Sequence, residues 1–194
     1  MNYPGNVKKT YKKNVSYANR GMDLENLINM INEYYCENEI AIIYKKPTPI
    51  QVVKYDYEHN RITDAYYKSP STLDYNGIYK SYYIEFDAKN TNKSNLPLSN
   101  IADHQIRHIR KILKQDAIAF LIIMINTECY LLPGESLLAF IDKGERKSIP
   151  YDYIKTNGYQ LNYSYLKGID YITAVDKIIK ERRDNEESNQ EIKC

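Results

Sequence analysis

The sequence contains no tryptophan, only 3 phenylalanines and only 3 cysteines among its 194 residues. Cys36, Cys129 and Cys194 are odd in number and widely spaced, which argues against a disulfide framework and a paired-cysteine zinc site. The longest apolar run, residues 117–125, is too short to span a bilayer. The first residues are polar and basic, without the hydrophobic segment of a secretion signal. We therefore expect a cytoplasmic protein with reduced thiols and no membrane association.

Charge is nearly balanced over the whole chain but not along it. The net charge is only +2, yet the first 20 residues contain five basic residues and no acid. Such a segment is typical either of a nucleic-acid contact or of a solvated terminus. We expect a flexible basic arm over residues 1–16, one domain over 17–181, and a disordered charged tail over 182–194.

Hydrophobic periodicity predicts helices and strands that alternate along the domain. Helices are expected over residues 19–35, 103–115, 135–140 and 172–181, and Asp103 is the expected N-cap of the second. Strands are expected over residues 41–46, 82–90, 117–125 and 128–133, and the third of them is apolar enough for burial on both faces. Residues 90–100 are expected to form a loop. This order indicates an α/β fold, a mixed β-sheet flanked by helices.

Residues 46–70 interrupt the core pattern. Two short strand-like pieces are separated by the polar turn "EHNR" and bounded by prolines. Their polar residues outnumber what a core accepts, which predicts a protruding β-hairpin stalk.

The strand-like stretch "YYIEFDAKN" carries charges at alternate positions. Residues two apart in a strand share a face, so Glu85, Asp87 and Lys89 lie in one row while Ile84 and Phe86 point to the opposite face. The same acid-any-lysine spacing recurs at Glu145 and Glu191, where polar surroundings indicate a solvated surface. Only the first occurrence has an apolar back face.

Asp74 precedes Asp87 by a short connection that can bring the two carboxylates together. Neighbouring carboxylates repel, so they favour a divalent cation between them, and Mg²⁺ prefers oxygen ligands and keeps waters. One such water can attack a phosphodiester while Lys89 offsets the growing negative charge. The alternative is an amphipathic strand whose charged face is only solvated. Spacing alone leaves both interpretations open.

Several ordered blocks resemble the RecU-type Holliday junction resolvases: "YANRGMDLE", "KKPTPIQVVK", "DAYYKSPSTLDYNGIY", "YIEFDAKN" and "PLSNIADHQIRHI". The resemblance extends from about residue 17 to residue 180. It implies a restriction-endonuclease-like core, a homodimer, a branched DNA substrate and Mg²⁺ as cofactor, with Mn²⁺ as a substitute.

The resemblance also implies roles for individual residues. It assigns Thr72, Asp74, Asp87 and Gln105 to the metal and makes Asp74, Asp87 and Lys89 the catalytic residues. The chain departs from the family pattern in two places: Glu85 and Asp87 exchange the two acids of the motif, and Leu73 replaces a threonine. Two further acids are candidates for an indirect role beside the metal, Glu25 and Glu85. A surface carboxylate is the alternative for Glu25.

Basic residues interleaved with tyrosines around the stalk suit contacts with phosphates and stacking on unpaired bases. The candidate DNA-binding residues are Arg20, Lys45, Lys46, Lys54, Arg61, Tyr66 and Tyr67. In a strand the two adjacent tyrosines face opposite ways, so one can stack on a base while the other packs within the hairpin. A hairpin stabilised by cross-strand tyrosines is the alternative. The three histidines do not have the spacing of a zinc set and suit solvated or phosphate-contacting positions.

The predicted function is structure-selective cleavage of four-way DNA junctions in recombination and repair, with recombinase or branch-migration proteins as candidate partners. Two alternatives remain: a restriction or repair endonuclease of the same fold that acts on duplex DNA, and a non-catalytic DNA-binding modulator of a recombinase.

Overall fold

The computed structural model describes residues 24–68, 72–164 and 166–191. The predicted basic arm and Arg20 lie outside these residues. In the described part of the chain, no helix combines the length and the apolar character needed to cross a membrane.

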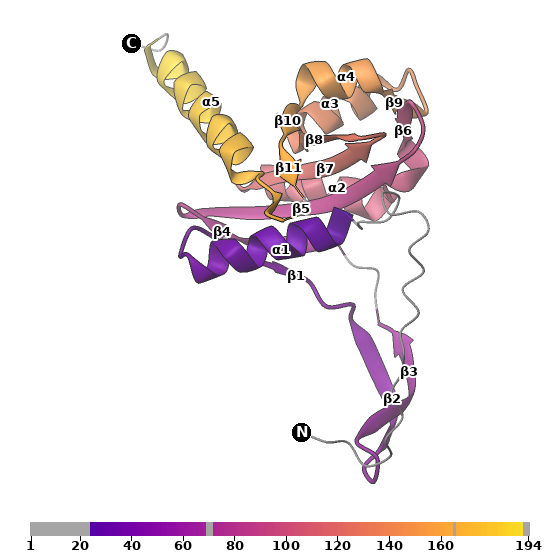
Figure 1. Cartoon of the computed structure of the whole chain (residues 1–194). Helices are drawn as coiled ribbons and strands as arrows, with labels where there is room; N and C mark the ends of the chain where they lie inside the picture. Colours follow the sequence, from indigo (N-terminus) through magenta and orange to yellow (C-terminus); the bar gives the residue numbers. More distant parts are fainter. Residues whose placement is uncertain (1–23, 69–71, 165, 192–194) are drawn as a thin grey trace.

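A six-stranded mixed sheet forms the centre of the molecule, with the order β1-β4-β5-β7-β8-β10 (Figure 1). Strands β5 and β7 are parallel and the other neighbours are antiparallel. The strands are β1 (Ile42–Lys45), β4 (Tyr75–Tyr79), β5 (Tyr82–Thr91), β7 (Ile118–Ile125), β8 (Glu128–Pro133) and β10 (Tyr159–Leu161).

Helices cover both faces of this sheet and create two cores. The first core includes buried residues of α1 (Leu24–Glu37) and α5 (Ile172–Glu191), and the second those of α2 (Asp103–Leu113), α3 (Gly134–Lys143) and α4 (Tyr151–Asn157). Every residue of β7 is buried because alternate side chains enter the two cores. The predicted α/β class, with a mixed sheet between helices, is confirmed.

The stalk consists of the antiparallel strands β2 (Ile50–Asp56) and β3 (Arg61–Tyr67), which project away from the sheet (Figure 1). Nearly all their residues are exposed, because a two-stranded hairpin without a covering layer has no interior. The predicted protruding hairpin is confirmed.

Several local predictions were wrong. Ala102, not Asp103, is the N-cap of α2. The side-chain oxygen of Gln105 accepts a hydrogen bond from the backbone N–H of Ala102 at 3.2 Å. The expected loop over residues 90–100 contains β6 (Asn95–Pro97), which pairs with β9 (Ser148–Pro150), and the short helix η1 (Leu98–Asn100). The small sheet of β11 (Tyr163–Ser164) and β12 (Gly168–Ile169) was not predicted.

The last helix also differs from the prediction. It was expected to end at Glu181, but α5 continues to Glu191, so most of the segment expected to be disordered is helical. Glutamate, lysine and arginine have good helix propensity, and their high charge misled the prediction.

The two cysteines in the described residues are free thiols, as expected: Cys36 is exposed and Cys129 is buried. Burial raises the pKa of the Cys129 thiol to about 12.

Candidate active site

Strand register brings the two predicted acids together. Tyr75 pairs with Phe86 across β4 and β5, so Asp74, just before β4, lies next to Asp87. Glu85 and Asp87 share one face of β5 and are each only 1% exposed. Helix α2 covers this face, as shown by the contacts of its side chains with both acids. The charged row is therefore buried, which excludes the alternative of a merely solvated strand face.

One carboxylate oxygen of Asp87 has hydrogen-bonding partners in the protein, and the other has none among the described residues. Its Oδ2 accepts a hydrogen bond from Gln105 Nε2 and forms an ion pair with Lys89 Nζ at 2.9 Å. Its Oδ1 is buried and has no hydrogen-bond partner among the described residues. A buried carboxylate oxygen without a partner carries a large desolvation cost, and a bound cation removes that cost.

Asp74 places a second carboxyl group beside that of Asp87. Its burial and the negative charge of Asp87 raise the pKa of Asp74, although Lys89 and Lys45 partly oppose this. When two carboxyl groups lie so close that the ionisation of one opposes that of the other, a divalent cation between them stabilises both charges. The acids thus fit such an ion, with oxygen donors of the type that Mg²⁺ prefers.

Gln105 connects the start of α2 to the acid pair. Its Nε2 donates to Asp87, while its Oε1 accepts from Ala102 N–H at 3.2 Å and from Lys89 Nζ at 3.4 Å. The structure therefore places Gln105, Lys89, Asp74 and Asp87 together, as predicted. The role of Gln105 as a metal ligand stays a prediction.

Glu85 is the centre of a second polar group on the same face. Its Oε1 accepts from Lys46 Nζ, from Thr72 Oγ1 at 3.1 Å, and contacts His108 Nε2 at 2.9 Å. Its Oε2 accepts from the Tyr83 hydroxyl at 2.8 Å. Burial alone would raise the pKa of Glu85, but hydrogen bonds from Lys46 and Tyr83 outweigh it and hold the pKa below its usual value. Both oxygens of Glu85 are thus occupied by protein groups.

Thr72 and Lys46 lie in this second group. The Thr72 hydroxyl accepts from Lys46 Nζ at 2.7 Å and donates to Glu85. The role of Thr72 as a metal ligand stays a prediction, because its hydroxyl is bonded here to Lys46 and Glu85. Lys46 was predicted to contact DNA, but its ammonium is paired with Glu85. The adjacent Lys45 pairs with Glu25, the acid proposed for an indirect role.

Sequence reasoning missed the contact of His108 with Glu85, and it placed Tyr83 on the charged face of the strand without giving it a role. Both contacts had a usable signal. His108 follows Gln105 by three residues, which puts the two side chains on neighbouring positions of one helix face. Tyr83 precedes Glu85 by two residues and therefore shares its strand face.

The remaining candidates lie on the stalk, Arg61 beside its turn and Tyr66 and Tyr67 at its base, where β3 ends. Lys54, Arg61, Tyr66 and Tyr67 are all exposed. The two tyrosines are 60% and 78% exposed, so the expectation that one of them packs within the hairpin is wrong. The hairpin has no second layer against which a tyrosine ring could pack.

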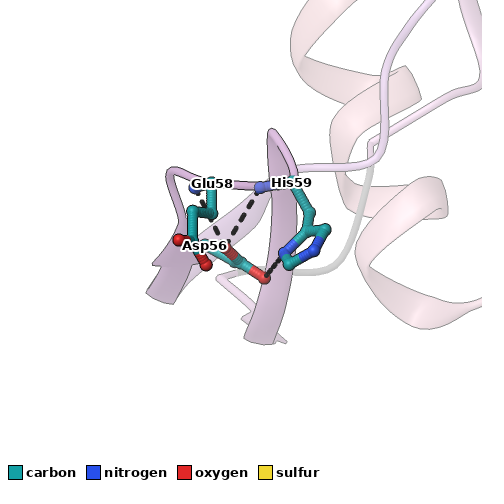
Figure 2. A group of neighbouring side chains, drawn as sticks. All are labelled: Asp56, Glu58 and His59. Atoms are coloured by element: carbon teal, nitrogen blue, oxygen red, sulfur yellow. Dashed lines mark hydrogen bonds and ion pairs between the residues drawn. The ribbon is translucent and has the colours of Figure 1, made fainter.

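A different acidic group lies at the turn of the stalk: Asp56, Glu58 and His59, whose potential ligand atoms are within 4.8 Å of one another (Figure 2). The Asp56 carboxylate accepts from the backbone N–H groups of Glu58 at 3.1 Å and His59 at 3.2 Å, and it contacts His59 Nδ1 at 2.9 Å. These bonds, above all those from His59, lower the pKa of Asp56. They are the bonds of an aspartate that stabilises its own turn.

Comparisons with known proteins give a family match and several similar chains. Residues 19–177 match the family described as Recombination protein U. The Holliday junction resolvase RecU of Streptococcus mutans is 45% identical, covering 92% of this chain and 98% of the relative, and that of Oceanobacillus iheyensis is 44% identical, covering 92% and 99%. Among solved structures, the Holliday junction resolvase Hjc of Archaeoglobus fulgidus aligns with a TM-score of 0.41 at 11% identity, covering 69% of this chain and 94% of that one. The extent of the family match and the identity of these relatives establish that the chain belongs to the RecU family.

Proposed function

We propose that the protein is a structure-selective endonuclease that cleaves four-way DNA junctions by divalent-metal-dependent phosphodiester hydrolysis. The observation that carries the proposal is the buried, unpartnered Oδ1 of Asp87 beside Asp74, with the Lys89 ammonium 2.9 Å from the other Asp87 oxygen. Relatives that share more than two-fifths of their residues with this chain and are named Holliday junction resolvases support the choice of substrate.

The residues divide the chemical work between them. Asp74 and Asp87 would hold the metal. For Gln105 to be a third ligand, its amide oxygen would exchange the hydrogen bonds that it accepts from Ala102 N–H and Lys89 Nζ for the metal. The metal, which we take to be Mg²⁺ with Mn²⁺ as a substitute, supplies a water of lowered pKa and charge compensation at the phosphate. Lys89 would neutralise negative charge as it grows on the phosphate. Glu85, through Lys46 and His108, would hold the neighbouring elements in place.

Junction cleavage requires two symmetric cuts, which a two-fold homodimer with one site per subunit can make. The stalk, with its exposed Tyr66 and Tyr67, would enter the open centre of the junction, where unstacked bases are available. Lys54 and Arg61 would contact phosphates, and recombinase or branch-migration proteins are the expected partners. We place the protein in the cytoplasm, where these substrates and partners occur in bacteria.

Two alternatives make different predictions. A duplex-cleaving nuclease of the same fold would keep the acid pair but would not depend on the stalk. A non-catalytic modulator of a recombinase would not need the acid pair, whereas here both acids and Lys89 are present and brought together.

The test is incubation of the full-length protein with a synthetic four-way junction and with a duplex of the same sequence. Each substrate is incubated with Mg²⁺, with Mn²⁺ and with EDTA. We expect symmetric, metal-dependent cuts in the junction and little cleavage of the duplex. Equal cleavage of both substrates would favour the duplex nuclease, and binding without cleavage in either metal would favour the modulator.

A further inference from the structure

One flank of α2 carries a line of basic side chains that the proposed site does not use. Arg107, Lys111 and Lys114 are all exposed. Their spacing of four and three residues places them on adjacent turns of one helix face. The opposite face of the helix, with Ile109 and Ile112, is buried in the second core. The line, which we call the α2 stripe, therefore faces away from the core.

None of the three cations has a side-chain hydrogen bond or ion pair within the part of the chain that the structure describes. Arg110, on the other flank of α2, shows the contrast. Both of its terminal nitrogens bind the carboxylate of Asp142 on α3, so this arginine ties two helices together. The stripe has no such internal function to explain its charge.

The stripe continues from the proposed active site. His108, which contacts Glu85 at 2.9 Å, precedes Lys111 by three residues and so occupies a neighbouring position on the helix surface. One turn earlier, Gln105 contacts Asp87. Gln105 lies on the buried side of α2 with Ile109 and Ile112, about 120° around the helix from Lys111. A DNA strand whose scissile phosphate lies at Asp74 and Asp87 would therefore reach the stripe past His108.

We propose that Arg107, Lys111 and Lys114 form a phosphate-binding track for the DNA arm adjacent to the cut, independent of sequence and of junction shape. This inference rests on the proposed DNA-cleaving function and adds a surface to it. Unpaired cations on a regular surface complement the evenly spaced charges of a DNA backbone, and such contacts position a substrate without reading its sequence.

The helix dipole offers a competing explanation. Cations at the end of a helix stabilise it by interaction with its C-terminal carbonyl groups, and Lys111 lies in the last turn of α2 while Lys114 is its C-cap. Arg107 is in the middle of the helix, where this effect is small. The two explanations differ in what they predict: the dipole affects stability alone, whereas the track affects the salt dependence of DNA binding.

The test compares full-length variants in which three charges are removed. The stripe variant carries Arg107→Gln, Lys111→Gln and Lys114→Gln. The matched control carries Lys155→Gln, Lys167→Gln and Lys180→Gln, which are exposed lysines on other elements. A third variant, Arg107→Lys with Lys111→Arg and Lys114→Arg, keeps the charge. Affinity for a junction and for a duplex is measured over a range of salt concentrations in EDTA, and circular dichroism verifies folding.

We expect the slope of log affinity against log salt to fall by about 0.9 for each lost phosphate contact, hence by about three for the stripe variant on both DNAs. The control and the charge-keeping variant should retain the wild-type slope. A stripe variant with the slope of the control would overturn the track, even if junction cleavage by the wild type is normal. Wild-type protein that binds DNA without cutting it would overturn the proposed function but not the slope comparison. Absence of DNA binding by the wild type would overturn both.

Discussion

Asp74 lies beside Asp87 because the residues that follow and precede them, Tyr75 and Phe86, are register partners in the antiparallel pair of β4 and β5. Their rings also stack, with centroids 4.8 Å apart and an interplanar angle of 6°. The acid pair is therefore fixed by strands of the central sheet and by aromatic packing beneath it. Sites on regular elements hold their geometry better than sites on loops, which suits a metal centre.

The acid pair should cost stability when no metal is present. The folded-state pKa of Asp74 is raised by burial and by Asp87, so the folded protein holds this proton more tightly than the unfolded chain. The corresponding stability is present below the unfolded pKa and is lost as pH rises through the folded pKa. In EDTA at neutral pH, Asp74→Asn should therefore melt at a higher temperature than the wild type, and the difference should vanish at acidic pH.

Differential scanning calorimetry with EDTA and with Mg²⁺ measures this effect. Mg²⁺ should stabilise the wild type but not Asp74→Asn. Asp64→Asn, an exposed acid on strand β3 of the stalk, is the control and should behave as the wild type. A metal-free Asp74→Asn variant that is less stable than the wild type at neutral pH would show that the carboxylate is a structural partner.

Lys89 should act on the reaction more than on folding. Its ammonium contacts Asp87, but Gln105 also donates to that carboxylate, so one hydrogen bond remains when Lys89 is removed. Lys89→Met keeps the apolar stem and removes the charge. We expect the single-turnover rate of junction cleavage to fall by roughly 10²–10³-fold, the usual effect of losing a group that stabilises developing charge.

The matching measurement is the melting temperature in Mg²⁺, which should change little. Lys89→Arg restores a positive charge and should recover part of the rate. Cleavage by Lys89→Met at the wild-type rate would remove the lysine from the chemistry.

Glu85 should be a major source of stability. It is buried and binds four groups, among them Lys46 Nζ and His108 Nε2. Glu85→Ala would leave Lys46 with the Thr72 hydroxyl but without its carboxylate partner. Breaking a buried ion pair from one side costs about 3 kcal/mol at the low end of the usual range, and the low end applies because water reaches Lys46. Urea denaturation measures the loss. Glu145→Ala, which removes an exposed loop carboxylate, should cost almost nothing. Equal effects of the two changes would contradict this account.

The sequence predicted those parts of the fold and site that depend on local patterns. The alternation in β5 predicted the row of Glu85, Asp87 and Lys89. The apolar run of β7 predicted burial on both faces, and the short connection from Asp74 predicted the acid pair. All of these follow from strand geometry, which fixes side-chain direction with a period of two.

Contacts between distant elements could not be predicted in this way. Lys46 comes from the segment after β1 and His108 from α2, and they meet only at Glu85. Gly77 makes the approach of β1 possible, because a Cβ there would lie 2.0 Å from the carbonyl oxygen of Ile42. Nothing in the sequence around Lys46 or His108 indicates that both contact Glu85, or that Gly77 allows β1 to approach β4. Charge also misled the prediction at α5, where helix propensity extends the helix.

The stalk tyrosines should determine the preference for junctions. Tyr66 and Tyr67 are both exposed, so both rings are available to unstacked bases. Stacking is worth about 1–3 kcal/mol per base, and 1.4 kcal/mol is a factor of ten in affinity. Replacing both tyrosines with Ala should narrow the ratio of junction to duplex affinity by tenfold or more, measured by gel shift in EDTA.

Because both rings are exposed, the hairpin should stay folded in this double variant, and circular dichroism checks this. Tyr34→Ala, a 52% exposed tyrosine on α1 and therefore outside the stalk, is the control. A folded double variant that prefers junctions as strongly as the wild type would move selectivity from the stalk to the rest of the molecule.

The single-turnover rate of junction cleavage by Asp87→Asn, measured as a function of Mg²⁺ concentration beside its affinity for the junction in EDTA, tests the central claim most directly. The change keeps the shape of the side chain and removes the charge that would hold the metal. Our account predicts that cleavage falls by at least roughly 10²–10³-fold at every Mg²⁺ concentration while junction affinity stays near that of the wild type. Cleavage by Asp87→Asn at the wild-type rate and with the wild-type Mg²⁺ dependence would contradict it.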